Sequence, residues 1–244
     1  MTETCSSLTF MVLHDPASRV TGIQPQKMNR TISDSTVQLG SVCVGKPPPH
    51  VELCVSGNGN KDGPLVGNIL TRGPHVMVRY WNGVTEGASV QRLNGWLDSG
   101  DIGWLDGNGE LWLVGRTKDR LKSGGENVYP EEVEAVLVQH PGISCVVVLG
   151  IPDVRLTEMV AACVCIREGW EWVDCAYDHS KDRKLLSTHI LQNHCRLRNL
   201  SRFKIPKICI PWKKPFPYTT TGKLKREEVR QEAISYLQFP PSSL

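Results

Sequence analysis

Residues 115–126 divide the sequence into two parts with different patterns. Four cations fall within seven residues of this segment, at Arg116, Lys118, Arg120 and Lys122, and two adjacent glycines follow. Such a segment can hold fixed positive charge and free backbone N–H groups against an anion. A basic turn that leads into a surface helix would look the same, so its meaning depends on the parts on either side.

The part before this segment predicts a small β-rich unit. Val51–Val55 alternates in polarity, and Gly67–Thr71 has the composition of a second short strand. Asp106–Gly109 is a strong hairpin-turn sequence, and Leu111–Val114 supplies the returning strand. Short strands at this close spacing indicate an antiparallel or barrel-like sheet.

The part after it predicts a mixture of helices and strands. Pro130 can begin a helix with acidic residues in its first turn, and Val133, Val136 and Leu137 would form its buried stripe. Further strands are expected at 145–150, 158–166 and 208–210, and further helices at 185–197 and 223–233. This mixed order predicts an α+β unit.

The balance of charge also changes at the basic segment. Residues 1–115 carry 8 Lys and Arg against 10 Asp and Glu, whereas residues 116–244 carry 20 against 15. We therefore expect one unit over 1–115 and another over 116–244. The positive excess favours a phosphate-rich small molecule over nucleic acid, because it is modest and lacks the interleaved aromatics of a nucleic-acid surface.

Cysteine and apolar patterns exclude several classes of protein. Nine cysteines are scattered without a C-x-x-C pair, which argues against a disulfide framework or zinc site and indicates a reducing, intracellular compartment. No run of 18 apolar residues is present, so no membrane span is expected. The final Ser242-Ser243-Leu244 is a weak variant of the peroxisomal S-K-L address, a match that chance often produces.

Five segments occur in the order found in the adenylate-forming acyl-CoA synthetase (AMP-binding enzyme) family. They are Thr2-Glu3-Thr4, Gly73–Trp81, Gly95–Gly103, Gly115–Glu126 and Pro217–Arg226. The second resembles the pattern G-P-x-V-M-x-G-Y, with Arg79 in place of the usual glycine, and we expect it to serve packing only. The third resembles W-[FY]-x-T-G-D-[IL]-G, the fourth G-R-x-[KD]-D-x-[IL]-K-x-x-G, and the fifth P-x-T-x-[ST]-G-K-[ILV]-x-R. The resemblance implies a β-rich remnant of the family's large N-terminal domain, followed by its small α+β C-terminal domain.

The resemblance assigns nucleotide contacts to three residues of the first unit and to Arg116, the first residue of the second. Thr2 would contact the nucleotide phosphate and Glu3 would hold Mg²⁺, a cation that is commonly coordinated by a carboxylate together with phosphate oxygens. Asp101 would accept both ribose hydroxyls, and Arg116 would reach ribose or phosphate with its planar donor fork. The alternative for Asp101 is an aspartate that caps a turn, which is the role we expect for Asp98.

The resemblance assigns the reactive residues to the second unit. Lys223 would be the catalytic lysine that neutralises charge between acyl carboxylate and α-phosphate; one well-aimed donor supplies roughly 3–4 kcal/mol. Lys122 would act on the thioester-forming face, where Gly124 and Gly125 permit close approach of a thin pantetheine chain. Lys118 would be the hinge that absorbs the dihedral change of a domain rotation. The alternative for Lys223 is a loop lysine before a helix.

The implied reaction uses ATP, Mg²⁺ and CoA and takes a small-molecule carboxylic acid as substrate. The acid would attack the α-phosphate of ATP to give an acyl-adenylate and release pyrophosphate, and the CoA thiolate would then attack the acyl carbon and displace AMP. Residues 122–129 with His140-Pro141-Gly142-Ile143 resemble the plant o-succinylbenzoate–CoA ligases of phylloquinone synthesis, which adds the chloroplast to the expected compartments. Ligases for another aromatic or fatty acid are the alternative.

The sequence begins inside the T-E motif, and the family's phosphate loop, S-[ST]-G-[ST]-T-G-x-P-K-G, is not found in it. We therefore expect a truncated form or fragment of a longer enzyme. Two interpretations of the isolated chain stay open: an acid–CoA ligase, or a non-catalytic binding or regulatory piece of one. The sequence predicts neither the acid nor the oligomeric state.

Overall fold

The structure, a computed structural model, describes residues 2–5, 7–11, 41–57, 64–78, 92–173 and 184–238. The chain separates into two compact units, Met1–Thr117 and Lys118–Leu244, with the division two residues beyond the expected boundary. Ser242–Leu244, the expected peroxisomal address, lies outside the described residues. None of the helices in the described ranges is long and apolar enough to cross a membrane.

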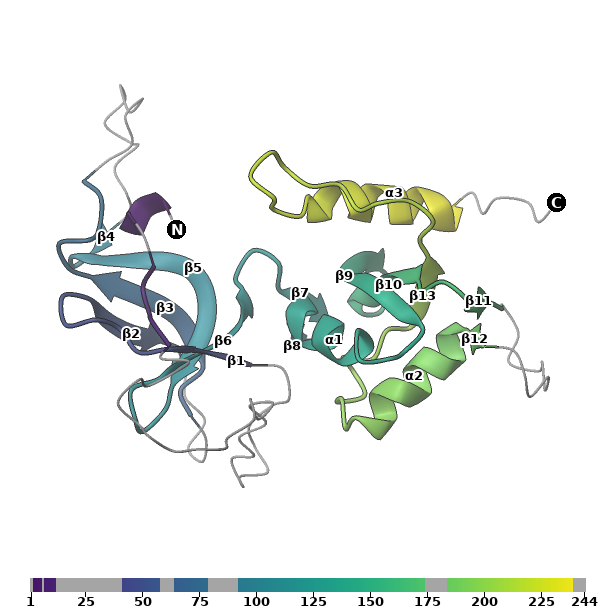
Figure 1. Cartoon of the computed structure of the whole chain (residues 1–244), viewed down its shortest axis with the longest axis horizontal. Helices are drawn as coiled ribbons and strands as arrows, with labels where there is room; N and C mark the ends of the chain where they lie inside the picture. Colours follow the sequence, from purple (N-terminus) through teal and green to yellow (C-terminus); the bar gives the residue numbers. More distant parts are fainter. Residues whose placement is uncertain are drawn as a thin grey trace, which may run out of the picture. The chain divides into compact units, whose positions relative to one another are not determined.

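The first unit is built on an antiparallel sheet (Figure 1). Its strands are β1 (Val42–Gly45), β2 (Glu52–Ser56), β3 (Gly67–Arg72), β4 (Arg92–Leu93), β5 (Trp96–Leu105) and β6 (Leu111–Arg116). The order is β1-β6-β5-β3-β2, and β4 pairs with β5. A short 3-10 helix, η1 (Thr2–Thr4), precedes the sheet. This architecture confirms the expected β-rich character of the first part.

The hairpin between β5 and β6 forms at the predicted turn because Asp106 organises it. Its carboxylate accepts the backbone N–H groups of Asn108 at 2.8 Å and Glu110 at 2.9 Å. It also accepts the indole N–H of Trp112 at 3.1 Å. Trp112 stacks on Trp104 of the opposite strand with the ring centroids 5.2 Å apart. The hairpin therefore fixes the register of β5 and β6 near the turn, and a register shift between Ile102 and Gly103 then brings Asp101 opposite Arg116.

The second unit mixes helices and strands, as expected. Its strands are β7 (Leu121–Ser123), β8 (Glu126–Val128), β9 (Ile143–Asp153), β10 (Thr157–Ile166), β11 (Glu171–Trp172), β12 (Leu185–Leu186) and β13 (Ile208–Pro211). Its helices are α1 (Pro130–Leu137), α2 (Thr188–Leu197) and α3 (Arg226–Gln238). The main sheet runs β13-β10-β7-β8 with β9 paired to β10, and β11 pairs with β12 in a separate ribbon.

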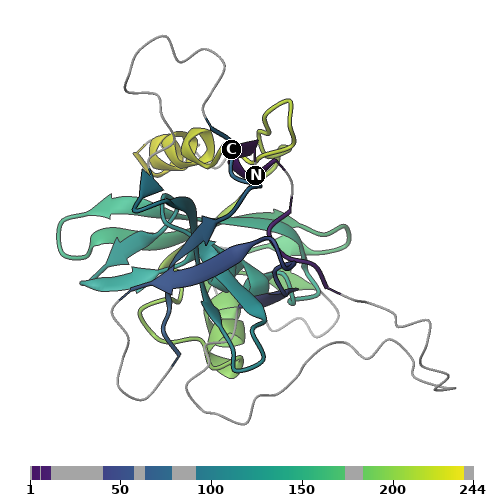
Figure 2. The same ribbon diagram turned by 90° about the vertical axis from the view of Figure 1, so that its left-hand side faces the viewer.

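The central strands β9 and β10 are covered on both faces. Val148 and Ala162 face a cluster that contains residues of α1 and α2, whereas Val147 and Cys163 face a cluster that contains residues of α3. Figures 1 and 2 both show α3 on one side of this sheet and α2 on the other. Burial on both faces explains why these strands are continuous apolar runs in the sequence.

Two helices begin later than the sequence predicts. The helix expected at 185–197 starts at Thr188, because the Ser187 hydroxyl accepts the N–H of Ile190 at 3.2 Å and caps the helix there. Leu185 and Leu186 form strand β12 instead. The helix expected at 223–233 starts at Arg226 and continues to Gln238. Lys223 therefore lies in the preceding loop.

Candidate functional site

Asp101 and Arg116 are directly opposite each other on β5 and β6. The Arg116 Nε lies 3.4 Å from Asp101 Oδ1. The Arg116 side chain is 57% exposed and that of Asp101 is 32% exposed, so both can still reach a ligand. The strands bring together the two residues to which the resemblance gives the ribose. The pairing of the strands thus puts a donor and an acceptor side by side on the surface of the sheet.

Burial raises the pKa of Asp101, and the guanidinium of Arg116 lowers it only in part. The carboxylate form is therefore less favoured than that of an exposed aspartate. A buried carboxylate gains from any donor that reaches it, and two ribose hydroxyls are such donors. Asp98 behaves differently, since it accepts the N–H of Gly100 at 2.8 Å and the amide of Asn68 at 2.9 Å. Asp98 lies within β5 and not in the turn expected for it, and these two bonds occupy its carboxylate.

Thr2 and Glu3 lie in η1. The Glu3 carbonyl accepts the N–H of Met77 at 2.8 Å, which ties η1 to the segment after β3. The neighbouring Thr4 is buried. In the described part of the chain, no cluster of three or more His, Cys, Asp or Glu residues could hold a metal. A single carboxylate still suits Mg²⁺, which commonly binds one or two carboxylates together with substrate phosphates.

Lys118 is the first residue of the second unit. The preceding Thr117 donates its N–H to the Gly100 carbonyl at 3.0 Å and so belongs to the β5–β6 end of the first unit. The expected hinge residue thus lies where the internal contacts of one unit stop and those of the other begin. This is the position at which a change in backbone dihedrals would disturb the fewest contacts.

Lys122 and the two glycines form the β7–β8 hairpin. Gly124 and Gly125 have φ angles of 60° and 87°, a conformation that favours glycine at both central positions of a two-residue turn. Nothing lies within 4 Å of a Cβ built on Gly125, so the turn is open on that side. The Lys122 N–H donates to Glu158 Oε2 at 2.8 Å. The glycines are therefore required by the turn itself. The open space beside Gly125 is compatible with the close approach of a ligand that the sequence predicts there.

Lys223 lies in a loop that closes on itself before α3. The Thr219 N–H donates to the Lys223 carbonyl at 2.8 Å, and the Lys223 N–H donates to Thr219 Oγ1 at 3.0 Å. Gly222, at φ 77°, makes the turn between them. The Lys223 side chain is exposed and makes no ion pair with the described residues. Its charge is thus available to a ligand.

Two buried charged groups, Glu132 and Lys204, were not singled out by the sequence. Lys204 Nζ lies 2.7 and 2.8 Å from the two carboxylate oxygens of Glu132, and both side chains are almost fully buried. Burial raises the pKa of Glu132, and the bonded ammonium of Lys204 opposes that rise. The pair joins α1 to the loop that follows α2. Only the rarity of a buried lysine could have revealed it, and burial is not visible in an isolated sequence.

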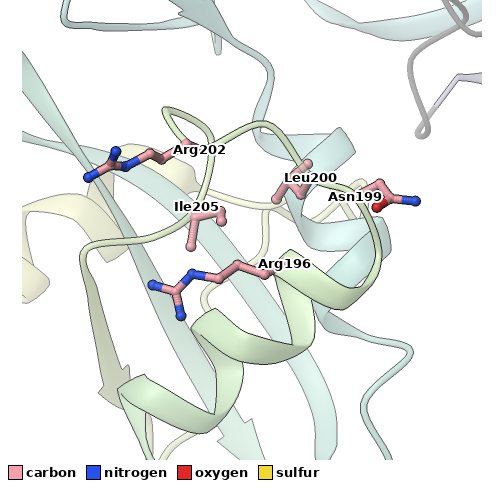
Figure 3. Close-up of a pocket in the computed structure, with 5 residues that line it drawn as sticks. All are labelled: Arg196, Asn199, Leu200, Arg202 and Ile205. Atoms are coloured by element: carbon pink, nitrogen blue, oxygen red, sulfur yellow. The ribbon is translucent and has the colours of Figure 1, made fainter.

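A pocket of about 390 Å³ also escaped the sequence analysis. Its walls are Arg196, Asn199, Leu200, Arg202 and Ile205, at and after the end of α2. Figure 3 shows both guanidinium groups extending to the same side, with Ile205 between them. Asn199 adopts φ 57° and the Leu200 N–H returns to the Cys195 carbonyl at 3.1 Å, which ends the helix. Two guanidinium groups on one side of a pocket are typical of an anion site.

Similarity to known proteins covers the whole chain. Residues 132–223 match the model of the AMP-binding enzyme C-terminal domain. The chain is 51% identical over 249 residues to 2-succinylbenzoate–CoA ligase, chloroplastic/peroxisomal, of Arabidopsis thaliana, covering 100% of this chain and 42% of that protein. It is 37% identical over 201 residues to indoleacetate–CoA ligase of Aromatoleum aromaticum, covering 82% of this chain and 36% of the relative.

A solved structure shows the same relationship. The o-succinylbenzoate CoA synthetase of Bacillus subtilis, in complex with its acyl-adenylate intermediate OSB-AMP, superposes with a TM-score of 0.66. The match is 30% identical and covers 94% of this chain and 40% of that chain. The chain belongs to the adenylate-forming acyl-CoA synthetase family. Within the family it is similar to the o-succinylbenzoate–CoA ligases, and it spans 36–42% of the two curated relatives described above.

Proposed function

We propose that this chain supplies the ribose-binding strands and the lysine-bearing small domain of an ATP-dependent acid–CoA ligase that acts on o-succinylbenzoate or a similar acid. The observation that carries the proposal is the Asp101–Arg116 pair, which strand register holds at 3.4 Å next to the boundary between the units. Cross-strand pairs of opposite charge are common in antiparallel sheets, so the resemblance of both segments to the family's motifs is what assigns this pair to the ribose.

The residues divide into roles that follow from their surroundings. Asp101 accepts the ribose hydroxyls and Arg116 donates to ribose or phosphate oxygens. Thr2 adds a phosphate contact, and Glu3 offers a carboxylate to the Mg²⁺ that accompanies ATP. That ion supplies positive charge to the phosphates during transfer.

The second unit supplies the reactive side chains. Lys223 stabilises the negative charge that develops as the acid attacks the α-phosphate, because its ammonium group is free of internal ion pairs in the described residues. Lys122 and the Gly124-Gly125 turn serve the later step, in which the thiol of CoA displaces AMP. Lys118 is the hinge between the two arrangements. The Arg196 and Arg202 guanidinium groups offer a place for the phosphates of CoA.

The name of the Arabidopsis relative supports a chloroplast or peroxisome as the compartment. Such a compartment agrees with the free cysteines of the described residues.

ATP–pyrophosphate exchange with o-succinylbenzoate, together with AMP binding by calorimetry, tests the proposal on the purified chain. We expect AMP binding that Asp101→Asn weakens. Exchange that depends on the acid would show that the chain acts as a ligase by itself. AMP binding without exchange would favour the non-catalytic binding role, and absence of both would overturn the nucleotide assignment.

A further inference from the structure

Arg226, the first residue of α3, joins parts of the second unit that are distant in sequence. Its Nη1 donates to Glu134 Oε1 at 2.5 Å and to the Val148 carbonyl at 2.7 Å. The same Glu134 oxygen accepts the Val148 N–H at 2.7 Å. Arg226 also lies 3.9 Å from Asp119 Oδ2 and 3.9 Å from Glu131 Oε1. One guanidinium group thus meets α1, β9 and the residue next to Lys118.

The position of this cation is not explained by the helix itself. A positive charge in the first turn of a helix opposes the macrodipole. The Arg226 side chain is only 17% exposed and faces three carboxylates, so its charge is held there by contacts with other elements. One buried carboxylate oxygen of Glu131 has no hydrogen-bond partner among the described residues. The described part of the cluster therefore contains no second donor that could replace Arg226. Loss of Arg226 would leave the carboxylates without their cation.

The loop that carries Lys223 is attached to the unit mainly at its base. Within the described chain, the hydrogen bonds of residues 218–224 all end inside 217–225. The base is closed by the Lys225 N–H, which donates to the Pro217 carbonyl at 2.9 Å. Leu224 adds an apolar contact with the core. Arg226 follows directly, so its anchorage sets the direction in which the loop leaves the domain.

We propose that Arg226 is a positioning residue that fixes the Lys223 loop to α1 and to the hinge-side Asp119. The inference rests on the proposed function for its catalytic meaning. α1 follows β8 after a single residue, so the same arginine links the Lys223 loop to the element that continues from the Lys122–Gly125 hairpin. The two reactive faces then move as one body when the chain turns at Lys118.

Amide hydrogen exchange on the purified chain tests the inference without any substrate. We expect Arg226→Ala to speed exchange of the amides in 217–225 by about 10-fold or more, with slow exchange retained in β9 and β10. The matched control is Arg230→Ala, because Arg230 also lies on α3 and donates to a β9 carbonyl, that of Gly150 at 2.7 Å. Arg230 contacts none of the three carboxylates around Arg226, so its loss should leave the loop unchanged.

If both substitutions speed amide exchange in 217–225 equally, Arg226 only helps to pack α3 against the sheet, and the inference is overturned. Unchanged exchange in the Arg226→Ala loop would overturn it as well. If Arg226→Ala fails to fold, Glu134→Gln decides instead, since it removes a partner charge and keeps the side-chain size. We expect the same selective loosening of 217–225 from that variant.

The effect of Arg226 on catalysis needs a separate kinetic measurement. In a ligase preparation that carries this sequence, Arg226→Ala should lower kcat for adenylate formation about 10-fold at unchanged KM for ATP, and Arg226→Lys should recover part of it. A selective exchange effect without any ligase activity in the wild type would reject the proposed function and keep the positioning role. Ligase activity in the wild type, with no effect of Arg226→Ala on amide exchange in 217–225, would reject the positioning role and keep the proposed function.

Discussion

The two units hold their candidate functional residues in opposite ways. In the first unit, Asp101 and Arg116 lie within paired strands and their separation follows from the register. In the second, Lys223 lies on a loop and Lys122 lies in a three-residue strand beside a tight turn, while buried charges such as Glu132 with Lys204 hold the framework. Strands suit a site that binds one group in one geometry. Loops on a rigid domain suit side chains that must be delivered in turn.

The largest expected effect is a loss of stability that is confined to the second unit. Glu132→Gln removes the partner of a buried lysine and should cost about 3–5 kcal/mol of unfolding free energy, because an uncompensated charge stays in the interior. The measurement is denaturant unfolding with exchange protection followed separately in β9 and β5. We expect protection to fall in β9 and to persist in β5.

A matched control is Glu228→Gln. Glu228 pairs with Lys225 at 2.7 Å, but both side chains are about half exposed. The loss should stay below about 1 kcal/mol. Equal losses for the two glutamates would show that the Glu132–Lys204 pair does not hold the domain together.

The next effect separates the reactive loop from the framework. In an intact ligase that carries this sequence, Lys223→Ala should slow adenylate formation by roughly 10²–10³-fold, the cost of one missing charge-stabilising donor, without lowering the melting temperature. Pyrophosphate exchange reports this step, and thioester formation from supplied acyl-adenylate reports the other.

Lys225→Ala is the control for that experiment, because Lys225 lies two residues away and its ammonium group is already engaged by Glu228. It should leave pyrophosphate exchange near its original rate. A Lys223→Ala enzyme that lost both half-reactions equally would contradict the division of labour between Lys223 and the Lys122 hairpin.

A smaller effect tests the strand-held pair. Asp101→Asn should weaken AMP binding by about 1.5–3 kcal/mol, the usual range for hydrogen bonds to a charged group. Asp98→Asn is the matched control on the same strand and should change AMP affinity little, since Asp98 is occupied by Gly100 and Asn68. Calorimetric titration with AMP distinguishes them; equal losses would mean that neither aspartate holds the ribose.

The pH dependence of AMP binding follows from the same carboxyl group. Burial raises the Asp101 pKa and Arg116 opposes the rise, so the proton-free form that accepts ribose hydroxyls is lost as pH falls through this raised value. Arg116→Ala removes the opposing contribution and should move the midpoint to higher pH. An unchanged midpoint, measured by AMP titration across pH, would show that the pair is not electrostatically coupled.

The sequence predicted the parts of the molecule that depend on local signals. The Asp106–Gly109 turn, the Pro130 helix start and the apolar runs of β9 and β10 each have a local cause, and each is confirmed. The α+β class followed from their order. Segment resemblance also predicted a nucleotide site that contains Asp101 and Arg116, and the two residues lie opposite each other on paired strands.

Long-range contacts could not be predicted. Lys204 and Glu132 are 72 positions apart, and Arg226 and Glu134 are 92 apart, so their pairing exists only in the folded domain. The late start of α3 has a similar origin. Residues 223–225 have a helical pattern, but Lys223 and Leu224 instead pair back with Thr219 and Tyr218. Helical periodicity gives no warning of such a competing turn.

The smallest expected effect compares two equivalent glycines. Gly125 at φ 87° and Gly109 at φ 77° both have open space where a Cβ would lie. Alanine at either position should therefore cost only the strain of the left-handed conformation, about 1–2 kcal/mol, in its own unit. If the Gly124-Gly125 turn serves the CoA step, Gly125→Ala, unlike Gly109→Ala, should also raise the KM for CoA, because the added methyl group blocks close approach of the pantetheine arm. Thioester kinetics at varied CoA check this, and an equal KM in the two variants would leave Gly125 with a purely structural role.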